Sequence, residues 1–355
     1  MIEHIYDRVF NFERINIDEG IKLLKEGDFL TLGKLANRIR FKKHPERVVT
    51  FILDTNINYT NICYVGCSFC AFYRKQGEPD AFTLRVSELK EKIMEAQRMG
   101  ITTALIQGGL NPELPYEYYL NMVKELKRSS VHVHAFSPPE IDLMSKISKK
   151  TIDEVFEDLK KAGLTTMPGG GAEILSERVR KKISPKKIST DRWLEIMEKA
   201  HKHGIKTTAT MMFGHIETEE DIIEHLDRIR SVQDRTKGFT AFIAWDFKKE
   251  NNELGRVVKK STTGIDYLKI VAIARIYLDN FDNIQASWAS QGKDIGELAL
   301  HFGANDMGSM LIEENVMKEA GFRAEASVDE IASLIKKAGF KPALRTTDYR
   351  IIKYF

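Results

Sequence analysis

The sequence predicts an α/β protein: a (β/α)8 barrel of the TIM type with N-terminal helices and a C-terminal extension. Three observations predict this class. Eight short β-rich segments between residues 48 and 306 are separated by amphipathic helical segments, the order of βα units around a parallel sheet. No Gly-rich dinucleotide turn follows the first segment, which argues against an open doubly wound sheet. The chain of 355 residues is long enough for one such barrel.

Three regions follow one another along the chain. Residues 1–47 are predicted to be helical, because Asn16-Ile17-Asp18-Glu19 resembles a capped helix start and apolar residues recur at helical spacing. Residues 48–306 form the predicted barrel. Residues 307–355 form an extension packed on the barrel, in which Ser327-Val328-Asp329-Glu330 is a capping box that begins a helix.

The predicted barrel strands are short and rich in β-branched and aromatic residues. They are 48–56, 102–107, 131–136, 164–167, 206–212, 239–245, 284–288 and 303–306. The predicted helices between them carry apolar residues at helical spacing. They are 86–98, 116–128, 151–162, 190–203, 218–232, 264–279 and 290–301.

The charge balance excludes some kinds of partner. The chain has 54 basic and 51 acidic residues, so we expect neither nucleic acid nor an anionic membrane as a partner. The first residues lack the basic and apolar regions of a signal peptide, and no apolar run reaches the roughly 18 residues of a membrane span. We therefore expect a reducing, cytoplasmic setting and a small-molecule substrate.

All three cysteines of the chain, Cys63, Cys67 and Cys70, lie in one loop with the spacing C-x3-C-x-Phe-C. Three soft thiolates on one loop suit zinc or iron–sulfur better than disulfides. A closed zinc site or an ordinary four-cysteine cluster needs a fourth protein ligand. Either a non-cysteine residue completes the site, or one metal position stays open for a substrate or cofactor.

The cysteine loop follows the first predicted strand, and active sites of such barrels lie at the carboxyl ends of the strands. Other strands end in comparable segments. Gln107-Gly108-Gly109 follows the second strand, Ser137 the third, and a Gly-rich segment ending at Glu173 the fourth. Small residues permit close backbone approach to a ligand.

This loop at this position resembles the radical S-adenosylmethionine (SAM) superfamily. The resemblance implies that the three cysteines hold three irons of a [4Fe–4S] cluster, while the fourth iron chelates SAM. It also implies SAM-binding residues, namely Phe69, Gln107, Gly108, Gly109, Ser137, Glu173 and Arg178. The alternatives are a tight turn for the glycine pair, a solvated helix face for Arg178 and a place in the core for Phe69.

A longer resemblance covers about residues 48–320 and points to the family of cyclic dehypoxanthine futalosine synthases in menaquinone biosynthesis. It rests on seven segments in the same order: Asn61–Val65, Ala71–Arg74, Ile106–Gly109, Gly169–Leu175, Thr210–His215, Phe239–Ile243 and Ile284–Trp288. Aminofutalosine synthases and deazaflavin-forming synthases are similar. Gln107, where we expect His in aminofutalosine synthases, favours the cyclase. Ala244 and Lys249 depart from the cyclase pattern, in which we expect Pro at both positions.

The resemblance implies that a 5′-deoxyadenosyl radical abstracts hydrogen from the ribose 4′ carbon of the substrate, which then closes a ring. We expect His215 or Asp306 as the base, and a donor such as flavodoxin or ferredoxin to supply the electron. Polar or aromatic residues at strand ends are the predicted substrate pocket: Trp245, Gln285, Trp288 and Asn305. As alternatives, Gln285 fills an inner barrel layer and Trp288 belongs to the core. The non-enzyme alternatives are an iron–sulfur electron carrier and a zinc-bound binding module.

Overall fold

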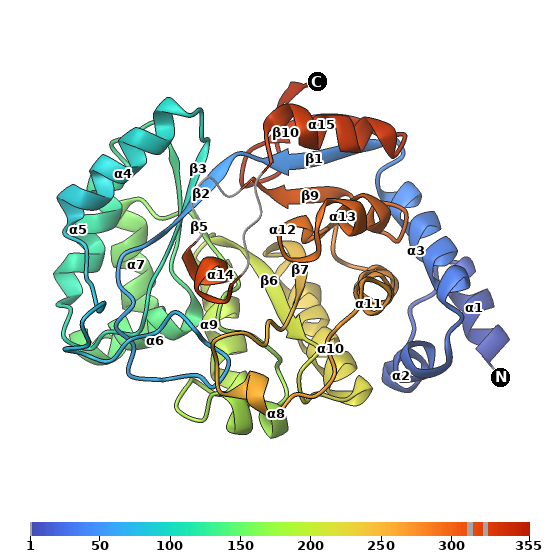
Figure 1. The fold of residues 1–355 in the computed structure, drawn as a ribbon, viewed down its shortest axis with the longest axis horizontal. Helices are drawn as coiled ribbons and strands as arrows, with labels where there is room; N and C mark the ends of the chain where they lie inside the picture. Colours follow the sequence, from blue (N-terminus) through green and yellow to red (C-terminus); the bar gives the residue numbers. More distant parts are fainter. Residues whose placement is uncertain (1, 311–314, 322–325) are drawn as a thin grey trace.

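The computed structural model describes residues 2–310, 315–321 and 326–355. A curled, mostly parallel sheet lies at its centre with helices on the outside (Figure 1). The strand order is β11-β10-β1-β9-β8-β7-β6-β5-β4-β3-β2. β1 (Val48–Ile52) pairs with β9 and β10, while β2 (Asp54–Asn58), the next strand along the chain, pairs with β3. The sheet therefore curls back on itself, and the predicted α/β barrel class is confirmed.

The other strands are β3 (Thr103–Gln107), β4 (His132–Ala135), β5 (Thr166–Met167), β6 (Lys206–Phe213), β7 (Phe239–Asp246), β8 (Asn283–Gln285), β9 (Asp306–Ser309), β10 (Lys341–Arg345) and β11 (Ile351–Tyr354). The helices are α1 (Ile2–Phe10), α2 (Ile17–Glu26), α3 (Phe29–Lys43), α4 (Val86–Arg98), α5 (Tyr116–Leu126), α6 (Pro138–Ser148), α7 (Ile152–Ala162), α8 (Glu177–Ile183), α9 (Thr190–Lys202), α10 (Glu219–Thr236), α11 (Gly264–Tyr277), α12 (Trp288–Gln291), α13 (Lys293–Ala299), α14 (Asn315–Glu319) and α15 (Val328–Lys337), with a short 3-10 helix η1 (Leu254–Arg256).

Each predicted strand segment overlaps a strand, but the first is divided into β1 and β2, and the fourth and the last two differ in extent. β8 ends at Gln285, because Trp288 already begins α12. β9 begins only at Asp306, after a turn in which Gly303 has φ +106°. Helix α6 was not predicted, and its first turn holds Pro138 and Pro139. Proline is tolerated there because first-turn N–H groups have no partner within the helix.

The C-terminal extension contributes to the sheet itself. β10 lies parallel to β1, and β11 returns antiparallel to β10. The boundary drawn at residue 306 falls at the first residue of β9. The predicted capping box at Ser327 is confirmed, since its side chain accepts a hydrogen bond from the backbone N–H of Glu330 at the start of α15.

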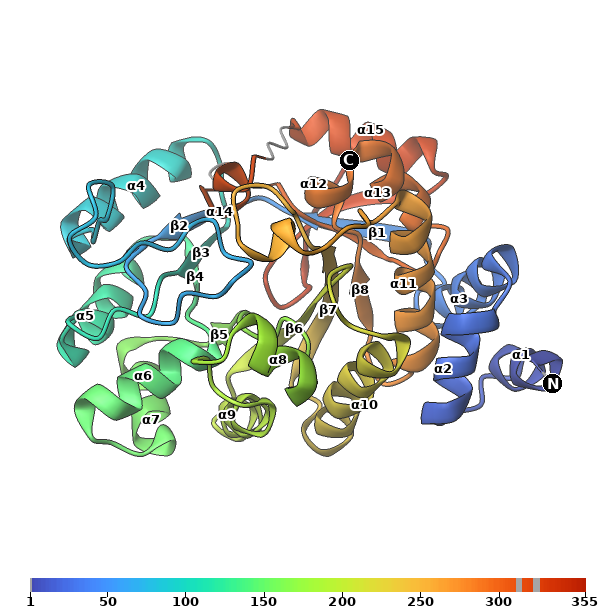
Figure 2. The ribbon, with the colours of Figure 1, turned by 60° about the horizontal axis from the view of Figure 1, so that its bottom comes forward.

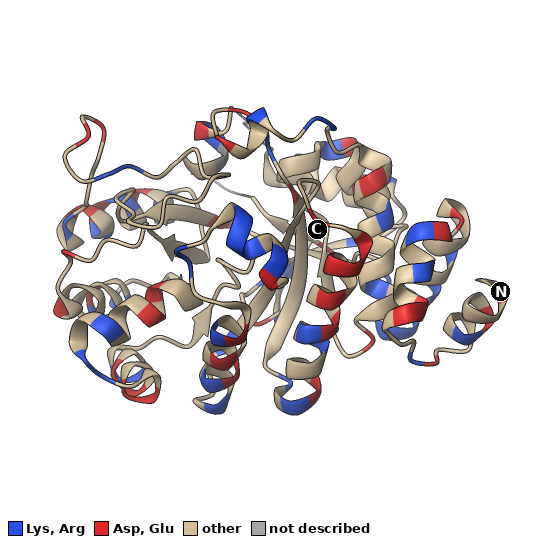
Figure 3. Cartoon of the chain, turned by 90° about the horizontal axis from the view of Figure 1, so that it is seen from below, with Lys and Arg blue, Asp and Glu red and all other residues tan. Residues whose placement is uncertain are grey.

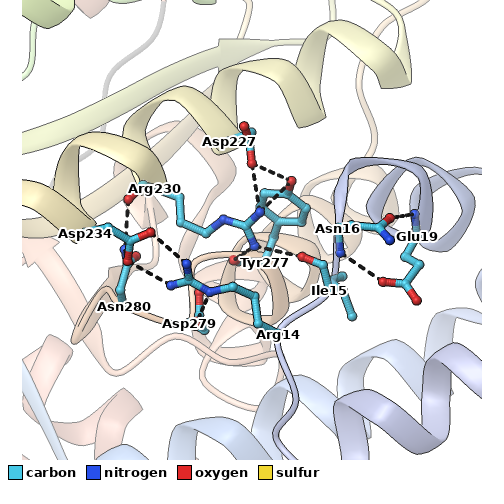
Figure 4. Close-up of polar contacts among 10 residues, drawn as sticks. All are labelled: Arg14, Ile15, Asn16, Glu19, Asp227, Arg230, Asp234, Tyr277, Asp279 and Asn280. Carbon is cyan, nitrogen blue, oxygen red and sulfur yellow. Dashed lines mark hydrogen bonds and ion pairs between the residues drawn. The ribbon is translucent and has the colours of Figure 1, made fainter.

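The N-terminal helices are confirmed and dock on α10 and α11 (Figure 4). Arg14 binds the Asp234 carboxylate at 2.7 Å and the Asp279 carboxylate at 2.9 Å. Arg230 of α10 donates to the carbonyl oxygen of Ile15 at 2.9 Å and to the Tyr277 hydroxyl at 2.9 Å. These ion pairs and hydrogen bonds tie the N-terminal segment to the outer helices of the barrel.

Charged residues of both signs are interspersed along the outer helices in the view of Figure 3. None of the helices in the described part of the chain combines the length and the apolar character that crossing a membrane requires. Outward strand positions such as Met211 of β6 and Phe242 of β7 are apolar and fully buried. The helices thus cover the outside of the sheet and leave the strand ends for a site.

Candidate active site

The three cysteines lie in the loop after β2, at the carboxyl end of the strands. Cys67 is buried, whereas Cys63 and Cys70 are half-buried. The backbone N–H of Cys63 donates to the carbonyl of Arg74 at 3.0 Å, and that of Ser68 donates to the carbonyl of Ile183 at 2.9 Å. The loop is therefore anchored both to its own later residues and to the end of α8.

The donor set of this loop fits a [4Fe–4S] cluster with one open iron. All three thiols are free of disulfides, and burial raises the pKa of Cys67 to about 11 and raises that of Cys70. Metal binding to such thiols must release protons. Within residues 2–310, 315–321 and 326–355, no group of three or more His, Cys, Asp and Glu side chains is already arranged to hold a metal. The thiols thus share one loop rather than a preformed cage.

Residues of this loop line a pocket of about 350 Å³. Cys67 and Cys70 line it together with Tyr73, and Arg256 lines it from the segment around η1. The backbone N–H of Leu254 donates to the carbonyl of Ser68 at 2.8 Å, which joins the two segments. Two of the three cysteines are therefore reached from the protein surface.

The glycine pair after β3 packs directly against the start of the cysteine loop. A Cβ on Gly109 would collide with the carbonyl oxygen of Ile62 and lie 3.1 Å from the Cβ of Cys63. A Cβ on Gly108 would lie 2.6 Å from the Tyr59 ring. Only glycine permits this approach. Among the described residues no hydrogen bond reaches the carbonyl oxygen of Gly108, which leaves that oxygen for a ligand.

Glu140, in the first turn of α6, joins the ends of three strands. Its carboxylate accepts hydrogen bonds from the Tyr59 hydroxyl at 2.7 Å, the backbone N–H of Gly108 at 3.2 Å and the Ser137 hydroxyl. Its exposed fraction is 2%, and burial raises its pKa to about 7 although the three donors oppose the rise. Ser137 was predicted as a site residue, whereas Glu140 was missed. The Ser-x-x-Glu spacing before α6 is the signal that could have found it.

Glu173 and Lys187 form a buried ion pair behind the cysteines. The Lys187 ammonium lies 2.6 Å from a Glu173 carboxylate oxygen and 5.1 Å from the centre of the Phe69 ring. Burial opposes the charge of Lys187, but Cys67 and Glu173 raise its pKa above the usual value. Glu173 has φ +46°, a conformation that non-glycine residues rarely adopt. Lys187 was missed because nothing in its local sequence separates it from neighbouring lysines.

The other predicted SAM-binding residues are placed as follows. The Arg178 guanidinium binds the Asp221 carboxylate, and the Arg178 side chain is 47% exposed. Gln107 is half-buried at the end of β3, where its side-chain nitrogen lies beside Gly170. The structure thus brings Gln107 and the segment with three glycines together, and it pairs Arg178 with α10.

Both candidate bases have protein partners. The His215 Nδ1 lies 3.0 Å from the Glu217 carboxylate, and the side chain has no exposed area. Asp306 is also fully buried, with its carboxylate 2.9 Å from an Arg345 guanidinium nitrogen and 2.7 Å from the backbone N–H of Gly308. A base role for either residue stays a prediction.

The four predicted substrate residues divide into two pairs. Trp245 and Gln285 are half-buried at the ends of β7 and β8. Trp288 is 2% exposed and donates its indole N–H to the carbonyl of Ser309 at 3.0 Å. Asn305 is 4% exposed and accepts a hydrogen bond from Arg275 at 2.6 Å. Trp288 and Asn305 are therefore enclosed by protein, while Trp245 and Gln285 retain accessible surface.

The accessible positions along the strands alternate with buried ones. Because successive strand side chains point to opposite faces, half-buried positions an even number of residues apart on one strand share a face, and eight of them are assigned to the inner face of the curled sheet. They are Leu105, Gln107, Thr208, Thr210, Ile243, Trp245, Gln285 and Ser309. At the end of β2, the side-chain oxygen of Asn58 is buried, and no described residue bonds to it. The inner face therefore offers polar groups to a ligand next to the cysteine loop.

Comparison with known proteins identifies the family. A family model described as the radical SAM superfamily matches residues 57–229, and one described as the CofH/MqnC C-terminal region matches residues 236–354. The fold is shared with the crystal structure of methylornithine synthase, with a TM-score of 0.74 at 20% identity over 96% of this chain and 97% of that chain.

Three curated relatives span nearly the whole chain. Cyclic dehypoxanthine futalosine synthase of Halalkalibacterium halodurans is 42% identical over 100% of this chain and 96% of the relative. Aminodeoxyfutalosine synthase of Thermus thermophilus is 41% identical over 98% and 95%. The 5-amino-6-(D-ribitylamino)uracil–L-tyrosine 4-hydroxyphenyl transferase of Methanopyrus kandleri is 40% identical over 96% and 94%. The chain therefore belongs to the radical SAM superfamily and is an enzyme of the branch that carries the CofH/MqnC C-terminal region.

Proposed function

We propose that this enzyme converts dehypoxanthine futalosine to cyclic dehypoxanthine futalosine in menaquinone biosynthesis. The observation that carries the proposal is the 42% identity, over the whole chain, to a relative named for that reaction. Gln107 before the glycine pair supports the same choice, since we expect His there in aminofutalosine synthases. A product two hydrogens lighter than the substrate is the expected result.

The cofactor half of the site lies at the carboxyl ends of β2, β3 and β5. Cys63, Cys67 and Cys70 would hold the cluster, and the free Gly108 carbonyl would accept a hydrogen bond from the SAM ammonium. Glu173, paired with Lys187, would bind the SAM ribose hydroxyls. When bound, the reduced [4Fe–4S] cluster and SAM supply one-electron cleavage of SAM and the 5′-deoxyadenosyl radical that takes the ribose 4′ hydrogen.

The protein residues would then position the substrate and remove a proton. Trp245 and Gln285 offer an aromatic face and an amide on the accessible inner face of the sheet. After the substrate radical closes onto its own aromatic ring, a proton and an electron must leave. His215 or Asp306 would take the proton, and the electron would pass to the cluster, which is oxidized when SAM is cleaved. The enclosing sheet keeps water from the reacting atoms. An electron donor such as flavodoxin or ferredoxin would dock at the pocket that reaches Cys67 and Cys70.

Two other reactions remain candidates, because relatives named for them are 41% and 40% identical to this chain. Anaerobic reconstitution, followed by incubation with SAM, a reductant and each candidate substrate, separates them by product mass. The proposed cyclase releases 5′-deoxyadenosine, whereas an aminofutalosine synthase incorporates the adenosyl group into its product. If the protein binds zinc in place of iron and does not cleave SAM, none of the three candidate reactions is its function.

A further inference from the structure

The turn between β10 and β11 lies inside the curled sheet. It is a tight turn, in which the backbone N–H of Thr346 donates to the carbonyl of Arg350 at 2.8 Å. The Thr347 hydroxyl is 2.8 Å from that of Thr103, the first residue of β3. The Tyr349 hydroxyl is 3.0 Å from the side-chain nitrogen of Gln285, the last residue of β8.

Strands β3 and β8 are separated by β4, β5, β6 and β7 in the sheet order. A single turn that bonds to both must therefore cross the space that the sheet encloses. On β3 the turn contacts the amino-terminal end, because Thr103 begins that strand, whereas on β8 it contacts the last residue, Gln285. β2 pairs with β3 and the cysteine loop follows the carboxyl end of β2, so beside β3 the turn and the cysteine loop lie at opposite ends of the strands. The red C-terminal segment is seen turning among the strands in Figure 2.

A buried ion pair anchors this turn. Arg345, the last residue of β10, binds the Asp306 carboxylate at 2.9 Å, and the two residues are 2% and 0% exposed. The Arg345 guanidinium lies 3.9 Å from the centre of the Tyr349 ring. Tyr349 has φ +65°, a conformation that is rare for a bulky residue and persists only where neighbours hold it.

The Tyr349 hydroxyl reaches a row of accessible side chains. Gln285 pairs in register with Ile243, and Ile243 with Thr210, and all three are half-buried on the inner face. The Tyr349 hydroxyl oxygen accepts the hydrogen bond from Gln285. Among the described residues its own hydrogen has no acceptor, and the Gln285 side-chain oxygen has no donor. Burial raises the pKa of Tyr349, which keeps this hydrogen in place at neutral pH.

We propose that Tyr349 and Gln285 form the floor of the substrate pocket and together bind one hydroxyl group of the substrate's sugar. A hydroxyl both accepts and donates, so it matches the O–H of Tyr349 and the amide oxygen of Gln285. Tyr349 is thus a positioning residue that comes from the C-terminal hairpin. The inference rests on the proposed function, which supplies a sugar-containing substrate.

The test compares Tyr349→Phe with Tyr354→Phe, a matched variant on β11 whose side chain is exposed. Iron content, Tm, the substrate-induced shift in Tm of the unreduced protein, and turnover of each candidate substrate are measured. We expect Tyr349→Phe to keep its iron, to lower kcat/KM roughly tenfold mainly through KM, and to weaken the substrate-induced shift. It should also release more 5′-deoxyadenosine per product, while Tyr354→Phe behaves as wild type.

Suppose that the wild type is active and that Tyr349→Phe has an unchanged KM and releases the same amount of 5′-deoxyadenosine per product. The assignment of Tyr349 to the pocket floor is then wrong, while the proposed function stands. A lower Tm with an unchanged KM would also overturn this assignment, because it would show that Tyr349 stabilises the fold without binding the substrate. If the wild type cleaves SAM but makes no cyclized product, the result contradicts the proposed function and not the role of Tyr349. If it turns over another candidate substrate, the same two variants are compared on that substrate.

Discussion

The Lys187 ammonium lies 2.6 Å from the Glu173 carboxylate, and the two side chains are only 10% and 7% exposed. Lys187→Met would leave the Glu173 carboxylate buried without its cation. Removing one partner of a buried pair costs about 3 kcal/mol or more of unfolding free energy. We expect that loss in urea unfolding of the cluster-free protein, together with less iron after reconstitution. The exposed neighbour Lys186 provides the control, and equal behaviour of Lys186→Met and Lys187→Met would refute the pairing role.

Glu140 predicts a pH-dependent stability. Burial raises its pKa from 4.5 to about 7 in the folded protein. A carboxyl group with a raised folded pKa stabilises the fold below its unfolded pKa, and this contribution is lost as pH rises through the folded pKa. Relative to Glu140→Gln, the unfolding free energy of wild type should therefore fall between pH 5 and pH 8, by about 3 kcal/mol at most.

The same pair of proteins is compared by urea unfolding at several pH values, with Glu157→Gln on the exposed face of α7 as the control. If the difference in unfolding free energy between wild type and Glu140→Gln stays constant over this pH range, the result contradicts a buried Glu140 carboxyl group with a raised pKa. Glu157→Gln should show no slope relative to wild type.

Gly109→Ala tests the contact between the glycine pair and the cysteine loop. The added Cβ would collide with the Ile62 carbonyl oxygen, so the loop must move and the cysteines with it. We expect a large loss of bound iron, measured by absorbance and metal analysis after reconstitution. Gly77→Ala is the control, because Gly77 has φ +85° but no atom within 4 Å of an added Cβ. It should lose about 1 kcal/mol of stability and keep its iron. Full iron content in Gly109→Ala would count against the contact.

His215→Asn tests one of the two candidate bases. If His215 takes the proton after ring closure, turnover should fall at least tenfold, while iron content and SAM cleavage without substrate stay at wild-type levels. Replacement of His215 also removes the contact with Glu217, so the Tm of the variant is recorded beside its turnover. Wild-type turnover in this variant would eliminate His215 and leave Asp306.

The sequence predicted the barrel and the cysteine loop because both depend on local patterns. Alternating β-rich and helical segments predicted βα units around a parallel sheet, and the spacing of Cys63, Cys67 and Cys70 predicted the donor set. The partners of those residues depend on tertiary packing. Asp306 binds Arg345, which is 39 positions away in the sequence, and Tyr59 donates a hydrogen bond to Glu140, which is 81 positions away.

The strands of the C-terminal extension were missed for a related reason. The periodicity of β10 and β11 covers only five and four residues, and β11 is exposed throughout. Such short segments carry too little pattern to separate a strand from a loop. The place of β10 beside β1, that of β11 beside β10, and the position of Tyr349 inside the sheet follow only from the assembled fold.

The most direct test uses dehypoxanthine futalosine carrying deuterium at the ribose 4′ carbon. The reconstituted enzyme is incubated anaerobically with SAM and a reductant, and both products are analysed by mass. The account predicts one deuterium in 5′-deoxyadenosine and a cyclic product that has lost that deuterium and one further hydrogen. Unlabelled 5′-deoxyadenosine, or a product that contains the adenosyl group, would contradict it.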